Sequence, residues 1–254
     1  MKLLALDAAS EQCSVALRND GEIAALEAKA DRGDGAQLLA MVEQLLAAAG
    51  LSLSALDAIA FGRGPGAFTG LRLAASLTQG LAFAAGLPVI GVSDLRAVAQ
   101  QVLGRPGTPA RALAVIDARM GEVYWAGFDL VAGRAQAATE EAVASPENAL
   151  AAARGWLGAS PPGGTVTGVA AGAAAGAGSG FAAYPLLRSA LAGLLQPILM
   201  PALPHAREVA RLAAHDGLGR AVPAEQALPV YVRNRVATPS GAAAPAAGAA
   251  PRAS

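Results

Sequence analysis

Short apolar runs at the start of the chain predict three neighbouring strands. Lys2 to Ala8 is apolar enough for a buried strand, and Cys13 to Arg18 alternates apolar and polar side chains with period two. Asn19-Asp20-Gly21 tolerates positive φ and precedes strand-like residues from Ile23 to Ala28. The pattern therefore predicts three antiparallel strands, two of them joined as a β-hairpin.

Apolar residues then recur at three- and four-residue spacing, which predicts an amphipathic helix from Ala36 to Ala49. Asp34 is its predicted N-cap, and Gly50 ends it. Strands and helices alternate after it. The predicted elements are a strand over Ala58 to Phe61, a glycine-rich loop over Gly62 to Gly70, a helix over Leu71 to Ala85, a strand over Pro88 to Val92, and a helix capped by Ser93 that reaches about Leu103.

The breaker cluster Arg105 to Pro109 marks a boundary, after which strands over Ala112 to Asp117 and Glu122 to Leu130 repeat the β-β opening. His205 to Ala214 has a helical pattern. Hairpin strands that precede the first helix favour a mixed α/β sheet over strict βαβ alternation. We expect lobes at 1–104 and 105–236, an Ala/Gly-rich insertion near 163–180, and a disordered tail at 237–254.

Composition supports a globular protein of two moderate domains, since 54% of the 254 residues are hydrophobic and 15% are charged. Nineteen basic and nineteen acidic residues leave no net charge, so contact with RNA is expected to be shared or indirect. The lone Cys13 rules out an intramolecular disulfide and suits a reducing compartment. The early Asp7 disfavours a signal peptide, and the uncharged run from Gly155 to Leu187 lacks the apolar density of a membrane span.

The segment Gly62 to Gly70 lies between a strand and a helix, where backbone N–H groups can cradle a phosphate. It lacks the Gly-Lys-Ser/Thr ending of a phosphate loop, and Pro65 removes one N–H donor. We therefore favour a structural turn over a phosphate site.

No residue is assigned a catalytic, cofactor-binding or metal-binding role. His205 and His215 are ten residues apart, about 280° around a helix, and do not share a face. Asp7 either faces a phosphate or magnesium ion across a cleft or caps the neighbouring turn. Asp117 and Glu122 flank an arginine, which a solvated hairpin turn with one ion pair explains.

Five ordered motifs between about Lys2 and Val236 resemble the bacterial TsaB family. They are Leu4 to Ala9 with Cys13 to Leu17, Phe61 to Arg72, Ile90 to Ser93, Asp117 to Tyr124, and Pro229 to Asn234.

The resemblance implies a two-lobed, actin-like and sugar-kinase-like fold in which each lobe has a βββαβα core. It also implies a cytoplasmic, non-catalytic subunit required for threonylcarbamoyl modification of the adenosine next to the anticodon in tRNAs that read codons beginning with A. The implied partners are TsaD and TsaE, with tRNA bound only through the complex and a homodimer as the alternative assembly of the isolated chain. Two rivals stay open: an ATP-binding sugar-kinase-like enzyme using Asp7 and the Gly-rich loop, and a glycoprotease-like metallopeptidase.

The apolar arc of the helix over Leu71 to Ala85 is wider than one sheet face requires. Either part of it is buried between the lobes or it forms an interface. The resemblance implies helix-to-helix pairing with TsaD and favours the interface. The predicted interface residues are Leu38, Val42, Leu45, Leu73, Leu77 and Leu81.

Overall fold

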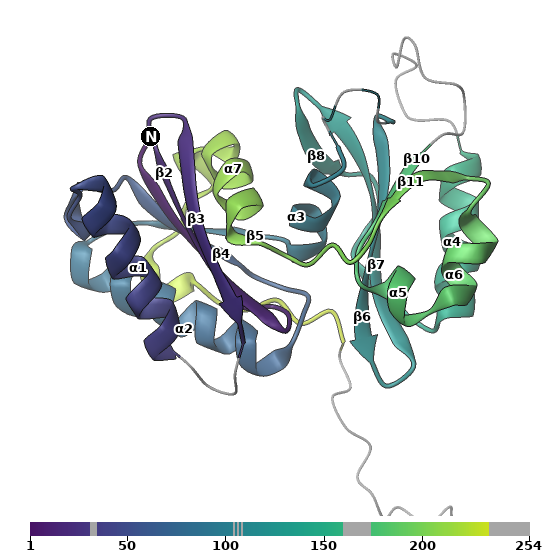
Figure 1. Cartoon of the computed structure of the whole chain (residues 1–254), viewed down its shortest axis with the longest axis horizontal. Helices are drawn as coiled ribbons and strands as arrows, with labels where there is room; N and C mark the ends of the chain where they lie inside the picture. Colours follow the sequence, from purple (N-terminus) through teal and green to yellow (C-terminus); the bar gives the residue numbers. More distant parts are fainter. Residues whose placement is uncertain (31–34, 104, 106, 108, 160–173, 234–254) are drawn as a thin grey trace, which may run out of the picture.

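The computed structural model describes residues 1–30, 35–103, 105, 107, 109–159 and 174–233. They form two lobes, each built on one mixed sheet with helices on both faces (Figure 1). The expected α/β, two-lobed, actin-like fold is confirmed. No helix within these described ranges is long and apolar enough to span a bilayer. The proposed N-cap Asp34 and the predicted tail at 237–254 lie outside the described residues.

The first sheet has the strand order β3-β2-β1-β4-β5. The elements of this part of the chain are β1 (Leu3–Asp7), β2 (Gln12–Asn19), β3 (Glu22–Lys29), α1 (Gly35–Ala49), the 3-10 turn η1 (Leu53–Ala55), β4 (Ala58–Gly62), α2 (Phe68–Ala85) and β5 (Val89–Val92). Asp20 and Gly21, with φ of 47° and 107°, close the predicted hairpin. Helix α2 begins at Phe68 rather than at the predicted Leu71.

Alternating side chains of the first sheet contact helices on opposite faces. Leu4 and Leu6 of β1 belong to the core beneath α1 and α2, whereas Leu3 and Ala5 belong to the core beneath α7 (Ala206–Asp216). Period-two burial on both faces explains why β1 reads as a continuous apolar run.

The second sheet repeats the plan of the first, with the order β11-β10-β6-β7-β8 and β9 paired with β7. Its elements are β6 (Arg111–Arg119), β7 (Glu122–Val131), β8 (Arg134–Ala137), β9 (Ala142–Ala144), α4 (Pro146–Gly158), β10 (Ala174–Ala177), α5 (Gly180–Ala183), α6 (Pro185–Leu191) and β11 (Leu195–Leu199). In both sheets the first strand is central and antiparallel to the second. It is parallel to a later strand, which is β4 in the first sheet and β10 in the second. The fold is an internal duplication.

The prediction of an insertion near 163–180 is wrong from residue 174 onward. Ala174–Ala177 is β10, a fully buried strand between β6 and β11. The space beside it is tight, since a Cβ at Gly176 would lie 3.2 Å from side-chain atoms of Ile198 and Phe181. Residues 160–173 are not described.

The predicted lobes at 1–104 and 105–236 also need correction, because two helices exchange lobes. Helix α3 (Asp94–Gln100) packs on β6 and β8 of the second sheet, and α7 packs on β1 and β2 of the first. The two helices lie side by side between the sheets (Figure 1). Arg96 of α3 and Asp216 of α7 form a two-bond ion pair at 2.5 and 2.9 Å.

After α7 the chain stays with the first lobe and then crosses to the second. The 3-10 turns η2 (Leu218–Arg220) and η3 (Ala224–Gln226) lead to Val230, whose N–H donates to the Arg63 carbonyl at 2.7 Å. Arg233 then pairs with Glu122 and donates to the Ala118 carbonyl at 3.2 Å. The chain around residues 228–233 thus ties the lobes together.

Candidate functional site between the lobes

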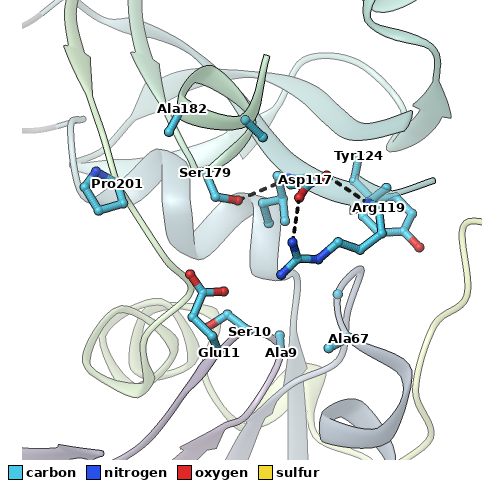
Figure 2. A pocket seen from close by; sticks show the side chains of 14 residues that line it. Ala9, Ser10, Glu11, Ala67, Asp117, Arg119, Tyr124, Ser179, Ala182 and Pro201 are labelled. Carbon is cyan, nitrogen blue, oxygen red and sulfur yellow. Dashed lines mark hydrogen bonds and ion pairs between the residues drawn. The ribbon is translucent and has the colours of Figure 1, made fainter. Parts of the chain in front are cut away.

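A cavity of about 370 Å³ opens between the lobes, at the ends of β1 and β6. Figure 2 shows the turn after β1 on one side and the turn after β6 on the other. The polar side chains that line it are Ser10, Glu11, Asp117, Arg119, Tyr124 and Ser179. Backbone N–H groups at such turns can cradle a phosphate when they are free of internal partners.

On the first-lobe side three of these N–H groups are already used. The N–H of Ala9 donates to Asp7 Oδ1 at 3.0 Å, and the N–H of Gln12 donates to Ser10 Oγ at 3.2 Å. The N–H of Ala67, in the glycine-rich segment, donates to the Ala9 carbonyl at 2.8 Å. Asp7 therefore caps its own turn, one of its two predicted roles, and these three N–H groups are not free for a phosphate.

The glycines of Gly62 to Gly70 serve close packing of this turn. A Cβ at Gly66 would lie 2.5 Å from the Ala9 carbonyl oxygen, and one at Gly70 would overlap the Ala8 carbonyl oxygen. Gly64 has φ of 109°, and its Cβ would lie 2.6 Å from the Val230 carbonyl oxygen. The favoured structural turn is what the geometry supports, because backbone occupies the space beside these glycines.

On the second-lobe side two N–H donors are also paired. The N–H of Asp117 donates to Ser179 Oγ at 3.1 Å, and the N–H of Arg119 donates to Asp117 Oδ1 at 2.9 Å. Asp117 Oδ1 also accepts from Tyr184 Oη at 3.2 Å. Asp117 Oδ2 pairs with Arg119 Nη1 at 3.2 Å (Figure 2). The predicted ion pair of this hairpin turn is confirmed for Asp117, whereas Glu122 pairs with Arg233.

The charges lining the cavity also oppose a polyphosphate. Glu11 and Asp117 contribute two carboxylates, and Arg119, already paired with Asp117, contributes the one cation. The side chain of Arg119 is 78% exposed, so its charge is largely solvated. The lining therefore has a slight negative excess where a phosphate site needs a positive one.

Behind the first turn, Asp7 forms a buried pair with Asp94 at the start of α3. Both residues have no exposed surface, and a Cβ at Gly62 would fall between Asp7 Oδ2 and Asp94 Oδ1. Burial raises the pKa of Asp7; burial and the neighbouring Asp7 charge raise the pKa of Asp94 well above its usual range. A proton held between the two oxygens satisfies both, since neither has another hydrogen-bond partner.

Three of the predicted interface residues are wrong. Leu38, Val42 and Leu45 of α1 are 0%, 2% and 6% exposed and belong to the first-lobe core. They are buried because α1 and α2 cover the same face of the sheet, so the apolar arc has an internal partner.

The other three predicted interface residues remain available. Leu73, Leu77 and Leu81 of α2 are half-buried and pack against the edge of the same core. Phe83, on the outer side of α2, is 83% exposed.

The two histidines serve α7 rather than a metal. His205 Nδ1 accepts from the Arg207 N–H at 3.0 Å and caps the helix, and His205 Nε2 lies 3.0 Å from Glu27. His215 lies in the last turn. Among the described residues, no three His, Cys, Asp or Glu side chains are grouped as a metal site would need. The buried Cys13 contacts Gln37 through Sγ at 3.7 Å.

Sequence reasoning missed Asp94, Tyr184 and Arg233. Asp94 follows the confirmed cap Ser93, whose Oγ accepts from the Arg96 N–H at 3.1 Å, and so resembles an ordinary first-turn acid. Gly62 is the residue that could have identified Asp94, because a side chain there would collide with both acids. This signal can be recognised only once β4 is known to end beside Asp7 and Asp94. Tyr184 and Arg233 reach the second turn from distant segments that carry no spacing signal.

Known proteins resemble this chain in sequence. Residues 28–165 match the family model described as TsaD: tRNA N6-adenosine threonylcarbamoyltransferase. The chain is 49% identical over 128 residues to the tRNA threonylcarbamoyladenosine biosynthesis protein TsaB of Escherichia coli (strain K12), covering 50% of this chain and 55% of that protein. The TsaB protein of Haemophilus influenzae is 48% identical over 125 residues, 49% and 52% of the two chains. The chain spans about half the length of the curated relatives it matches.

Solved structures extend the similarity to nearly the whole described chain. An uncharacterized protein from Pseudomonas aeruginosa, described as similar to the peptidase YeaZ, is 40% identical with a TM-score of 0.73. That alignment covers 91% of this chain and 99% of the other. The structure described as YeaZ from Pseudomonas aeruginosa is 41% identical over the same shares, with a TM-score of 0.71.

Proposed function

The chain belongs to the TsaB family, and from this premise we propose that it is a non-catalytic subunit of the machinery that attaches threonylcarbamoyl to an adenosine of tRNA. The modified adenosine lies next to the anticodon in tRNAs that read codons beginning with A. The chain acts in the cytoplasm as a scaffold for the transferase TsaD, with TsaE joining the assembly and tRNA bound through the complex.

One observation carries the non-catalytic part of this proposal: four backbone N–H donors around the interlobe cavity are already used in internal hydrogen bonds. Ala9 and Ala67 are paired on one side, and Asp117 and Arg119 on the other. Opening these bonds to bind ATP would leave buried acceptors without partners. The same observation argues against a sugar-kinase-like reaction.

The test begins with the purified chain. Given threonylcarbamoyl-adenylate and tRNA, the chain alone forms no threonylcarbamoyladenosine, whereas the chain with its cellular TsaD does, as measured by nucleoside mass spectrometry. Turnover by the chain alone would show that it is an enzyme. In parallel, titration with magnesium-ATP should give no saturable signal, and tight binding would favour the kinase-like rival.

The scaffold role requires a surface for TsaD, and the half-buried row Leu73, Leu77 and Leu81 on α2 supports such a surface. Leu77→Glu should abolish TsaD binding while the chain stays folded, because a charge at the centre of a desolvated interface costs several kcal/mol. Leu150→Glu is the matched control, since Leu150 is also half-buried on a helix but lies in the second lobe.

Circular dichroism and a pull-down with TsaD decide the result. A Leu77→Glu protein that unfolds would place Leu77 in the core. A folded Leu77→Glu protein that still binds TsaD, or a Leu150→Glu protein that loses binding, would place the interface elsewhere.

A further inference from the structure

Arginines gather in two grooves on either side of the end of α7, and neither groove shares a lining residue with the interlobe cavity. The first groove has a volume of about 570 Å³ and runs between the lobes. Its charged lining residues are Arg63, Arg96, Arg134, Arg220, Glu141 and Asp216. The second, of about 410 Å³, lies between α7 and the β2–β3 hairpin and is lined by Arg18, Arg207, Arg211 and His215.

The two grooves form one basic face. His215 lines the second groove and its neighbour Asp216 lines the first. The Arg134 guanidinium, in the first groove, donates to the His215 carbonyl at 3.2 Å. Along α7, Arg207 and Asp216 are separated by about 13 Å at roughly 1.5 Å per residue. This basic face is therefore longer than a single phosphate group.

Carboxylates neutralise fewer than half of these arginines. Arg96 pairs with Asp216, Arg63 with Glu141 at 3.3 Å, and Arg211 more loosely with Glu208 at 3.9 Å. Of the described residues, no carboxylate lies within ion-pair distance of the remaining arginines of the basic face, which are Arg18, Arg134, Arg207 and Arg220.

Three of those four arginines are held by backbone oxygens. Arg18 donates to the Met1 carbonyl at 2.7 Å, Arg207 to the Ile23 carbonyl at 3.0 Å, and Arg134 to the His215 carbonyl. A carbonyl orients a guanidinium without removing its charge, so N–H groups remain for an anion. The absence of net charge in the whole chain conceals this local excess.

We propose that the basic face binds the phosphodiester backbone of the tRNA. Guanidinium groups bind phosphate oxygens through paired N–H donors, and successive phosphates suit two grooves in series better than one small anion does. The inference rests on the proposed function, because that function brings tRNA to the assembly. It adds that this chain supplies phosphate contacts of its own within the complex.

The experiment uses the full chain assembled with TsaD and fluorescently labelled tRNA, with binding followed by anisotropy across a range of salt concentrations. Arg211→Gln combined with Arg220→Gln removes two exposed charges from the basic face. Arg154→Gln combined with Arg188→Gln is the matched control, because both arginines are exposed on helices of the second lobe.

The Arg211→Gln/Arg220→Gln double variant should bind tRNA about 25-fold more weakly than wild type at 0.1 M salt. The slope of log K against log salt should become less steep by about 1.4, because each lost phosphate contact removes roughly 0.7 from that slope. The control should stay within about twofold of wild type. The inference is overturned if both double variants lose tRNA affinity equally or if the Arg211→Gln/Arg220→Gln variant loses none. It is also overturned if the wild-type complex does not bind tRNA.

Two more measurements distinguish tRNA binding from protein or membrane binding at the basic face. If the Arg211→Gln/Arg220→Gln variant no longer binds TsaD, the basic face is a protein interface. If this variant binds phosphatidylserine vesicles more weakly but tRNA as well as wild type, the basic face is a membrane contact. Either result overturns the inference. Failure of the wild-type complex to form threonylcarbamoyladenosine would instead refute the proposed function. If the wild-type complex modifies tRNA but the variants bind tRNA as well as wild type, this inference is refuted and the proposed function stands.

Discussion

The turns that follow β1 and β6 occupy equivalent positions in the duplicated lobes, yet the aspartate beside one turn is buried and the aspartate beside the other lines the cavity. An aspartate followed by alanine lies at or near the end of each strand: Asp7-Ala8 ends β1, and Asp117-Ala118 lies in the last residues of β6. Asp7 is fully buried against a second acid. Asp117 lies in the cavity wall, where its partners are Arg119 and Tyr184. The same strand order thus carries one aspartate in the interior and one at the cavity.

The difference shows that equivalent turns of a duplicated fold can be held in place by different contacts. In the first lobe the backbone at Gly66 and Gly70 packs against the turn and uses the space beside it. In the second lobe three consecutive residues with positive φ, Arg119, Met120 and Gly121, shape a turn held by side-chain contacts. Tight packing closes one wall, and a solvated ion pair forms the other.

The largest predicted effect tests the closed wall. Gly70→Ala should destabilise the protein by about 3 kcal/mol or more, because the new Cβ would overlap the Ala8 carbonyl oxygen and the overlap can be relieved only by a shift of the backbone. Urea unfolding followed by circular dichroism measures the loss.

Gly80→Ala provides the control within the same helix. No atom lies within 4 Å of a Cβ at Gly80, so this substitution should stabilise the protein by up to about 1 kcal/mol through helix propensity. If both substitutions stabilise the protein equally, the first turn is not packed as described.

Most of the first lobe could be predicted because its signals are local. Period-two burial, the Asp20-Gly21 turn, the Ser93 cap and the glycine stops each act within a few residues. The sequence pattern places the start of α2 too late because no side chain caps the helix before Phe68. The start of the helix is instead held by backbone packing of Gly66 and Gly70 against the first turn.

The errors lie where distant segments decide the structure. Strand β10 is Ala174–Ala177, whose residues have weak strand propensity and are strands only because β6 and β11 enclose them. The exchange of α3 and α7 leaves no trace in periodicity, since either helix would be equally amphipathic on either sheet. The pairing of Asp7 with Asp94 follows from that exchange and could not be predicted before it.

The second prediction concerns the buried acid. Asp7→Asn should stabilise the protein at pH 7 by about 1 to 3 kcal/mol, because the wild-type pair must take up a proton at a pH where a free aspartate is ionised, at a cost of about 1.4 kcal/mol per pKa unit. The amide oxygen still accepts from the Ala9 N–H, and the new Nδ2 donates to Asp94 Oδ1 without a shared proton. Unfolding free energies measured from pH 4 to 8 test this.

The pH dependence follows from the raised pKa values of Asp7 and Asp94. The folded wild type holds more protons than the unfolded chain, so its stability falls as pH rises from about 4 through the raised pKa values. The Asp7→Asn curve should be flatter. Adding Asp94→Asn should cancel the gain, because two amide NH₂ groups would then face each other. A destabilised single variant with an unchanged pH slope would contradict the shared proton.

The smallest predicted effect comes from the equivalent change in the second lobe, and its sign is opposite. Asp117→Asn keeps an amide oxygen that accepts from the Arg119 N–H and from Tyr184 Oη, so both hydrogen bonds survive. What is lost is the ion pair at 3.2 Å with a guanidinium that is 78% exposed. Solvent screens such a pair, and its loss should destabilise the protein by less than about 1 kcal/mol. The same urea titrations at 0.05 and 0.5 M salt should show a difference from wild type that shrinks at high salt. A gain in stability equal to that of Asp7→Asn would mean that Asp117 is as poorly solvated as its counterpart, and the contrast between the two turns would not hold.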